Sequence, residues 1–256
     1  MRVKYGIAVE GLNGSAGGTT AARNKSREYF KIRTAPRNPR TTGQSVARGR
    51  LSNISKSWGV LTDDQRKQWD EFAKTQKGRR VLGVAGVLSG FNAFSRIGLN
   101  LAICGNAASP TPPNSVFVPE LTKINVSVDG TTGNVSLWPT ALFPNAEGMT
   151  NQYVFTYKLA IEITPVLPDG RAGDKSALRL ITVGNESSTT GRPGEITSLE
   201  QIDVSADYLA KYGVVLEEGN KVQVAIKAIG LDVAYNGVST LKIYDTIVIP
   251  AKPSAE

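Results

Sequence analysis

The chain has 256 residues, of which 40% are apolar, and its charge is unevenly divided along its length. Residues 1–105 carry 19 Lys and Arg against 6 Asp and Glu, whereas residues 106–256 carry 11 against 16. There is no histidine and one cysteine, which excludes Ser-His-Asp and Cys-His catalysis, zinc sites built from His or from Cys alone, and an internal disulfide. This composition predicts a packed, turn-rich protein whose two parts have different neighbours, and it predicts no enzyme.

The sequence also gives no sign of a membrane or an oxidising compartment. No apolar stretch approaches the ~18 residues of a membrane span, and the N-terminus lacks the apolar core of a signal peptide. A single thiol does not imply an oxidising compartment either. We therefore expect a soluble protein that is made in the cytoplasm and has no membrane partner.

The composition of residues 1–40 predicts an extended basic arm. Apolar and polar residues alternate in 3–9 and in 28–33, as in strands with one covered face, while 11–18 is typical of a flexible turn. Few apolar residues are available for a core, so the arm should order only against the rest of the protein or a neighbouring subunit. Its candidate partner-binding residues are seven cations, Arg23, Lys25, Arg27, Lys31, Arg33, Arg37 and Arg40.

These seven cations fit two kinds of partner. With the interleaved Tyr29 and Phe30 they have the composition that holds a phosphate backbone and stacks on nucleic-acid bases. They equally suit ion pairs with an acidic protein surface. The second interpretation is favoured, because no helix-turn-helix, zinc-finger or RNP motif accompanies the charges.

The spacing of apolar residues in 41–105 predicts a helical region that begins with a hairpin of two helices. In the first helix four apolar residues fall on one side at near-helical spacing, namely Val46, Leu51, Ile54 and Trp58. The segment 59–61 ends this helix. Thr62 and Gln65 then have the spacing of a capping box, which predicts the start of a second helix whose apolar side holds Trp69, Phe72 and Ala73.

A third helix is predicted to start after Ser89, with Phe91, Phe94, Ile97 and Leu101 on its apolar side. The Gly-rich segment 78–88 has no clear period and stays unassigned. Cys104 follows an apolar run, and we expect a buried thiol that acts as a small hydrophobic residue.

Residues 106–119 contain four prolines, which predicts a semi-rigid linker. The pattern of residues 120–252 predicts a β-sandwich. Apolar and polar residues alternate in 121–128, and the further strand candidates, separated by turns, are 134–138, 153–164, 178–183, 222–229 and 241–249. Trp138 is expected to be the core tryptophan. The predicted fold class is therefore α+β, with a basic arm and helical hairpin followed by an antiparallel sandwich of immunoglobulin-like or fibronectin-III-like topology.

Carboxylate pairs and Gly-rich segments form catalytic or phosphate-binding sites in other proteins, but in this chain they have ordinary structural explanations. The carboxylate pairs 63–64 and 70–71 lie on an amphipathic helix, where acidic residues are usually solvated. The Gly-rich segments 11–18 and 83–86 lack the spacing of a phosphate-binding loop. The sequence accordingly predicts no catalytic residue, no metal site and no cofactor.

One combination of motifs resembles a known group of proteins. It consists of the turn 38–44 (NPRTTGQ), Arg48 and Arg50 on the following helix, the helix start 61–69 (LTDDQRKQW) and the later helix 90–101 (GFNAFSRIGLNL). Together these resemble small phage and prophage proteins described as virion structural proteins. The chain departs from their pattern at Gly98, where they carry a polar residue. The resemblance covers about residues 11–115 closely and the remainder only in architecture.

The resemblance implies a structural component of a tailed-phage virion, and we expect it at the head, as a minor capsid or decoration protein anchored by its basic arm and helices. The implied partners are other virion proteins, such as major capsid or neck subunits, and further copies of the chain in the particle. Two alternatives stay open at this point, a nucleic-acid-binding protein and a neck or tail component. The resemblance brings no catalytic residues.

Overall fold

The computed structural model has an α+β fold, as the sequence predicts. It divides into two compact units, residues 1–47 and residues 48–256. The structure describes residues 14–23, 28–34, 40–81, 84–114, 118–143, 153–232 and 236–252, with the backbone alone for Arg23, Glu28, 77–81 and 84–87. None of the helices in this described part is both long and apolar enough to cross a bilayer.

The first unit contains a three-stranded antiparallel sheet formed by β1 (Gly14–Ala16), β2 (Thr19–Arg23) and β3 (Glu28–Ile32). β1 and β2 are joined by Gly17 and Gly18, whose φ angles of 50° and 83° favour glycine. The strand predicted at 28–33 is confirmed. The stretch 11–18 was expected to be only a turn, yet its part 14–16 is a strand, because the paired glycines make a tight hairpin. The strand predicted at 3–9 lies outside the described residues.

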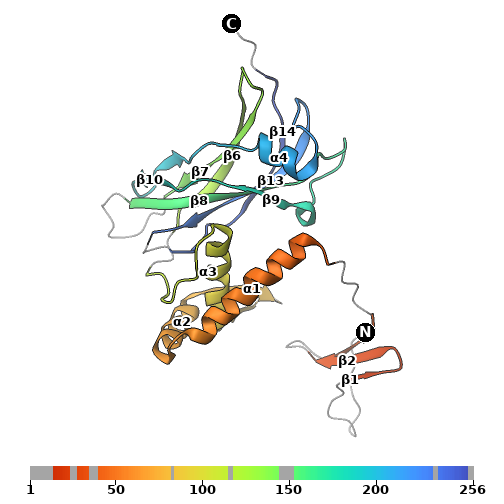
Figure 1. Cartoon of the computed structure of the whole chain (residues 1–256), viewed down its shortest axis with the longest axis vertical. Helices are drawn as coiled ribbons and strands as arrows, with labels where there is room; N and C mark the ends of the chain where they lie inside the picture. The colour runs from red at the N-terminus through yellow and green to blue at the C-terminus, as the bar shows by residue number, and fades with distance from the viewer. Residues whose placement is uncertain are drawn as a thin grey trace. The chain divides into compact units, whose positions relative to one another are not determined.

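The predicted helical region contains α1 (Thr42–Val60), α2 (Asp63–Thr75) and α3 (Gly90–Ile103), with the hairpin β4 (Lys77–Val81) and β5 (Val84–Val87) between α2 and α3 (Figure 1). The predicted apolar sides of α2 and α3 are confirmed. Trp69 and Ala73 of α2 are buried against Phe94 and Leu101 of α3. The N-terminal caps predicted for both helices are also present.

The predicted side of α1 is covered only in part. Ile54 is buried and Trp58 is half-buried, with Trp58 packed on the rings of α3. Val46 and Leu51 are 48% and 46% exposed, so the predicted apolar side is packed only in the second half of the helix. The described contacts of α1 with α3 are made by its second half, where Ile54 lies against Gly98 and Trp58 against Phe91 and Phe94.

The described residues between 118 and 252 contain two antiparallel sheets. One contains β6 (Glu120–Val128), β7 (Val135–Leu142), β11 (Ile196–Ser198) and β12 (Ile202–Asp203). The other contains β8 (Tyr153–Ile163), β9 (Arg179–Val183), β10 (Ser187–Gly191), β13 (Lys221–Gly230) and β14 (Ile243–Val248). The 3-10 helix η1 (Lys175–Ala177) precedes β9, and α4 (Ser205–Tyr212) connects β12 to the segment before β13 (Figure 1).

Both sheets contribute to one hydrophobic core. On β7 the buried residues alternate along the strand, and they include Val135, Leu137 and Ala141, which pack with residues of β8 and β13. Trp138 falls between two of these positions and is half-buried, so its prediction as the core tryptophan is wrong. Because side chains alternate across a strand, a core position at Leu137 places its neighbour on the other face of the sheet.

Within the second unit, the described first part of the Pro-rich segment lies against the helices. The indole Nε1 of Trp69 donates a hydrogen bond to the carbonyl oxygen of Pro110 at 3.0 Å. Pro113 and Pro119 are buried. These contacts tie the Pro-rich segment to α2, and the predicted boundaries of the linker stay a prediction.

Candidate functional site

The structure describes the side chains of three of the seven predicted partner-binding cations, Lys31, Arg33 and Arg40, and all three are exposed. Lys31 lies on β3 opposite Thr20 of β2, and the backbone N–H of Arg33 donates to the carbonyl oxygen of Gly18 at 2.7 Å. The Arg33 side chain is therefore carried at the end of the small sheet.

The other four cations cannot be placed as side chains. Arg23 is described as backbone on β2, and Lys25, Arg27 and Arg37 lie outside the described residues. Lys31 thus lies on β3 and Arg33 directly follows that strand, and partner binding by the whole set stays a prediction.

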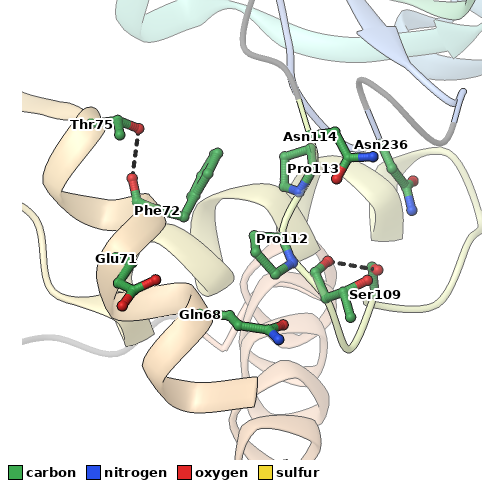
Figure 2. A pocket seen from close by; sticks show the side chains of 10 residues that line it. Gln68, Glu71, Phe72, Thr75, Ser109, Pro112, Pro113, Asn114 and Asn236 are labelled. Carbon is green, nitrogen blue, oxygen red and sulfur yellow. Dashed lines mark hydrogen bonds between the residues drawn. The ribbon is translucent and has the colours of Figure 1, made fainter. Parts of the chain in front are cut away.

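A cavity of about 710 Å³ lies between α2 and the Pro-rich segment (Figure 2). Gln68, Phe72 and Thr75 of α2 line one side, and the segment from Ser109 to Asn114 lines the other. Two of its hydroxyl groups are already used, since Thr75 donates to the carbonyl oxygen of Phe72 and Ser109 to that of Thr111. Glu71 is the one charged residue among the described lining side chains, so this wall offers no cation for a phosphate.

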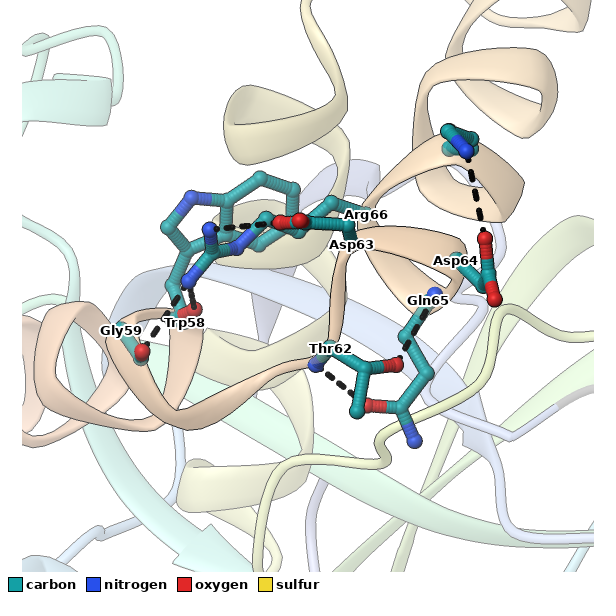
Figure 3. Close-up of polar contacts among 8 residues, drawn as sticks. Trp58, Gly59, Thr62, Asp63, Asp64, Gln65 and Arg66 are labelled. Carbon is teal, nitrogen blue, oxygen red and sulfur yellow. Dashed lines mark hydrogen bonds and ion pairs between the residues drawn. The ribbon is translucent and has the colours of Figure 1, made fainter.

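The corner between α1 and α2 is fixed by local polar contacts (Figure 3). Gln65 N–H donates to Thr62 Oγ1 at 3.3 Å, and Thr62 N–H donates to Gln65 Oε1 at 2.9 Å, which confirms the predicted capping box. Arg66 reaches back and donates from Nη2 to the carbonyl oxygen of Gly59 at 3.0 Å. Since the last carbonyls of a helix have no partner within it, Arg66 stabilises the end of α1.

The acidic residues of α2 also have structural roles. Asp63 pairs with Arg66 at 3.3 Å and Asp64 pairs with Lys67 at 3.2 Å, both on the exposed side of the helix. Asp70 Oδ1 accepts a hydrogen bond from the Gly90 N–H at 2.9 Å and so caps the start of α3. A Cβ on Gly90 would lie 2.4 Å from that oxygen, so this contact requires glycine.

A buried polar cluster joins α3 to the sheet of β8 and β13. Lys227 Nζ donates to Asn100 Oδ1 at 2.8 Å, and Asn100 Nδ2 donates to the carbonyl oxygen of Gly237 at 2.9 Å. Nearby, Lys242 Nζ pairs with Glu162 Oε1 at 2.5 Å. Burial and the neighbouring Lys242 lower the pKa of Lys227, because both disfavour the charged amine.

Cys104 lies beside this cluster and is buried, as predicted. Its carbonyl oxygen accepts a hydrogen bond from Lys158 Nζ at 3.3 Å. Burial raises the pKa of the Cys104 thiol, and a thiol that stays protonated is a poor nucleophile. The cluster is therefore suited to holding helix and sheet together rather than to bond-making chemistry.

Sequence reasoning missed Lys227, Asn100 and Arg66. A signal existed for Lys227, which is the one charged residue in the apolar run 222–229. Such a residue in a strand buried on both faces needs a partner, but the sequence does not say that the partner lies on α3, 127 positions earlier.

Neither a known family model nor a curated protein matches this chain.

Proposed function

We propose that the protein is a structural component of a tailed-phage virion, attached to the head as a minor capsid or decoration protein after synthesis in the host cytoplasm. Its partners would be major capsid or neck subunits and further copies of itself, and it would carry out no reaction. The motifs in 38–44, 61–69 and 90–101 motivate this proposal.

The observation that carries the proposal is the exposed, positively charged start of the chain. Lys31 on the small sheet and Arg33 just after its last strand are exposed, and the following helix α1 carries Arg48, Arg50 and Lys56 without any acidic residue. A sheet of three short strands has little apolar surface with which to stabilise itself. Elements of this kind gain stability when a partner covers them, as subunits do in an assembled particle.

We extend the proposal to the finer fold of residues 120–252, an immunoglobulin-like or fibronectin-III-like sandwich. The two antiparallel sheets with one shared core support it, as do strands of five to eleven residues in β8, β9, β10, β13 and β14. Such a module would project from the anchored helices and meet neighbouring virion proteins.

The experiment replaces Arg33, Arg37 and Arg40 with Ala in the phage genome and measures the protein in gradient-purified particles by quantitative mass spectrometry. The proposal expects the variant to fold and to be lost from particles, since the arm's acidic protein partner no longer holds it. Substitution of Lys67, Lys74 and Lys123 with Ala, which are exposed and lie outside the arm and α1, serves as a control for the loss of three charges alone.

Nucleic-acid binding is the second candidate function, and the aromatic residues next to the exposed cations favour it. Tyr29 and Phe30 are half-buried on β3 beside Lys31. A protein that binds phosphates loses affinity steeply as salt rises, because counterions are released on binding. Filter binding of random duplex DNA over a series of salt concentrations tests this candidate. If affinity falls steeply with salt, and the triple Ala variant loses this affinity while it is still incorporated into particles, nucleic-acid binding is favoured over the first candidate.

A neck or tail position is distinguished from a head position by antibody labelling of particles in electron micrographs.

A further inference from the structure

The cavity between α2 and the Pro-rich segment is lined by polar side chains that are available to a ligand. Gln68 and Glu71 of α2, Asn114 of the Pro-rich segment and Asn236 of the β13–β14 connection form no side-chain hydrogen bond or ion pair with other described residues. Figure 2 shows Gln68 extending from α2 toward the Pro-rich segment. These groups come from three separate segments and surround one space of about 710 Å³. Small-ligand sites have volumes of ~300–1,000 Å³.

An apolar surface lies next to these polar groups. Phe72 is half-buried and lines the cavity, and its ring packs edge-on against that of Trp69, with 5.7 Å between the ring centroids. Pro112 and Pro113 line the opposite side. An aromatic ring and two prolines beside amide and carboxylate groups suit a ligand that has both an apolar face and many polar groups around its edge.

The walls of the cavity are held in place without a ligand. Trp69 donates its indole N–H to the carbonyl oxygen of Pro110 at 3.0 Å, which fixes the Pro-rich segment to α2. The carbonyl oxygen of Gly237, the residue after Asn236, accepts a hydrogen bond from Asn100 of α3 at 2.9 Å. A site that is already formed loses little conformational entropy on binding, so a few hydrogen bonds are enough to give measurable affinity.

The lining disfavours three other classes of ligand. An anion would meet the Glu71 carboxylate and find no cation among the described lining side chains. An apolar ligand would take the amides out of water without replacing their hydrogen bonds. An extended peptide needs free backbone groups to pair with, but proline has no N–H and the backbone of α2 is bonded within the helix. A neutral sugar meets all these conditions, because each of its hydroxyl groups both donates and accepts.

We propose that this cavity binds a neutral glycan, with the apolar face of a sugar ring on Phe72 and the sugar hydroxyl groups bonded to Gln68, Glu71 and Asn114. The Glu71 carboxylate accepts hydrogen bonds from hydroxyl groups, and the two amides both donate and accept. This binding activity goes beyond the proposed structural role and does not depend on it. Its test therefore uses purified protein without particles.

The test applies the full-length protein to an array of immobilised glycans. The array carries neutral oligosaccharides of glucose, galactose, mannose and N-acetylglucosamine, together with sulfated and uronate-containing glycans as anionic members. Isothermal titration calorimetry with the best-bound free oligosaccharide then compares wild type with Gln68→Ala, Asn114→Ala and the double variant. Two matched controls, Gln201→Ala and Asn92→Ala, change exposed residues of the same types outside the cavity. Thermal unfolding shows whether each variant keeps its fold.

Wild type and both controls should bind one or more neutral glycans with equal affinity and leave the anionic glycans unbound. Each single variant should bind about 3–10-fold more weakly, as for the loss of one neutral hydrogen bond, and the double variant more weakly than either. The proposal is overturned if wild type binds no glycan of the array, if it prefers the anionic glycans, or if the double variant binds like wild type. It is also overturned if wild type binds no glycan but selects a peptide from a random library and the double variant loses that peptide, because the cavity would then be a peptide site.

Discussion

Lys227 on β13 donates a hydrogen bond to Asn100 on α3, with 2.8 Å between Nζ and Oδ1, and the structure buries both side chains. Asn100 uses its other amide atom to hold Gly237 of the β13–β14 connection. A Cβ on Gly237 would lie 2.5 Å from Ile97 Cγ2, so only glycine lets this connection lie on α3. One asparagine thus joins a helix, a strand and a loop.

Removing either member of this hydrogen bond should destabilise the fold. Asn100→Ala leaves the Lys227 amine buried without its acceptor, and a lost partner of a buried polar group costs about 1–3 kcal/mol. Lys227→Met keeps the length of the side chain and removes the charge. Urea unfolding of both single variants and the double variant should give a coupling free energy, whereas additive effects would show that the two side chains act independently.

The lowered pKa of Lys227 gives this effect a pH dependence. Between the lowered folded-state pKa and the unfolded value near 10.5, the unfolded chain binds more protons than the folded protein. The free energy of unfolding should therefore rise with pH in that interval. The Lys227→Met variant should lose this rise. The neighbouring titratable groups are present in both proteins, so their contributions to the pH dependence cancel in the comparison; these groups are Lys158, Lys242, Glu162 and Cys104. Equal slopes in wild type and variant would contradict the assignment.

Trp69 should be the most sensitive residue of the helical region. It is fully buried, its ring lies 5.2 Å from that of Phe94, and its indole N–H is bonded to Pro110. Trp69→Ala should lower the free energy of unfolding by about 3–5 kcal/mol, as for other large aromatic residues in cores. Trp69→Phe, which keeps most of the apolar contact, should cost less. An unchanged melting curve for Trp69→Ala would contradict the burial.

The α1–α2 corner should depend on Thr62 and Arg66. Thr62→Ala removes the N-cap acceptor and should destabilise by about 1 kcal/mol. Arg66→Met removes the donors to Gly59 and the ion pair with Asp63 while keeping the stem, and should cost a similar amount. Lys67→Met, whose ion pair with Asp64 is exposed, should change stability little. Thermal unfolding of the three variants tests this ranking.

The features that were predicted correctly from the sequence are those set by nearby residues. Thr62 and Gln65 are three positions apart, so the capping box follows from local geometry alone. The apolar sides of α2 and α3 follow in the same way from helical spacing.

The features that were missed depend on contacts between distant segments. The stripe of α1 has a helical period, but its burial depends on which other elements pack against it, and Leu51 is exposed. Trp138 belongs to an alternating strand, and only the second sheet decides that Leu137 faces the core. The Lys227–Asn100 bond spans 127 positions, and no local rule connects its two residues.

We have proposed that this protein is part of a phage particle. The most direct test of this proposal is quantitative mass spectrometry of particles purified on a density gradient from an induced culture, with soluble host proteins as the measure of contamination. The account predicts that the protein co-purifies at a fixed ratio to the major capsid protein through successive gradients. Its absence from those particles, with abundant protein left in the soluble lysate, would contradict the account.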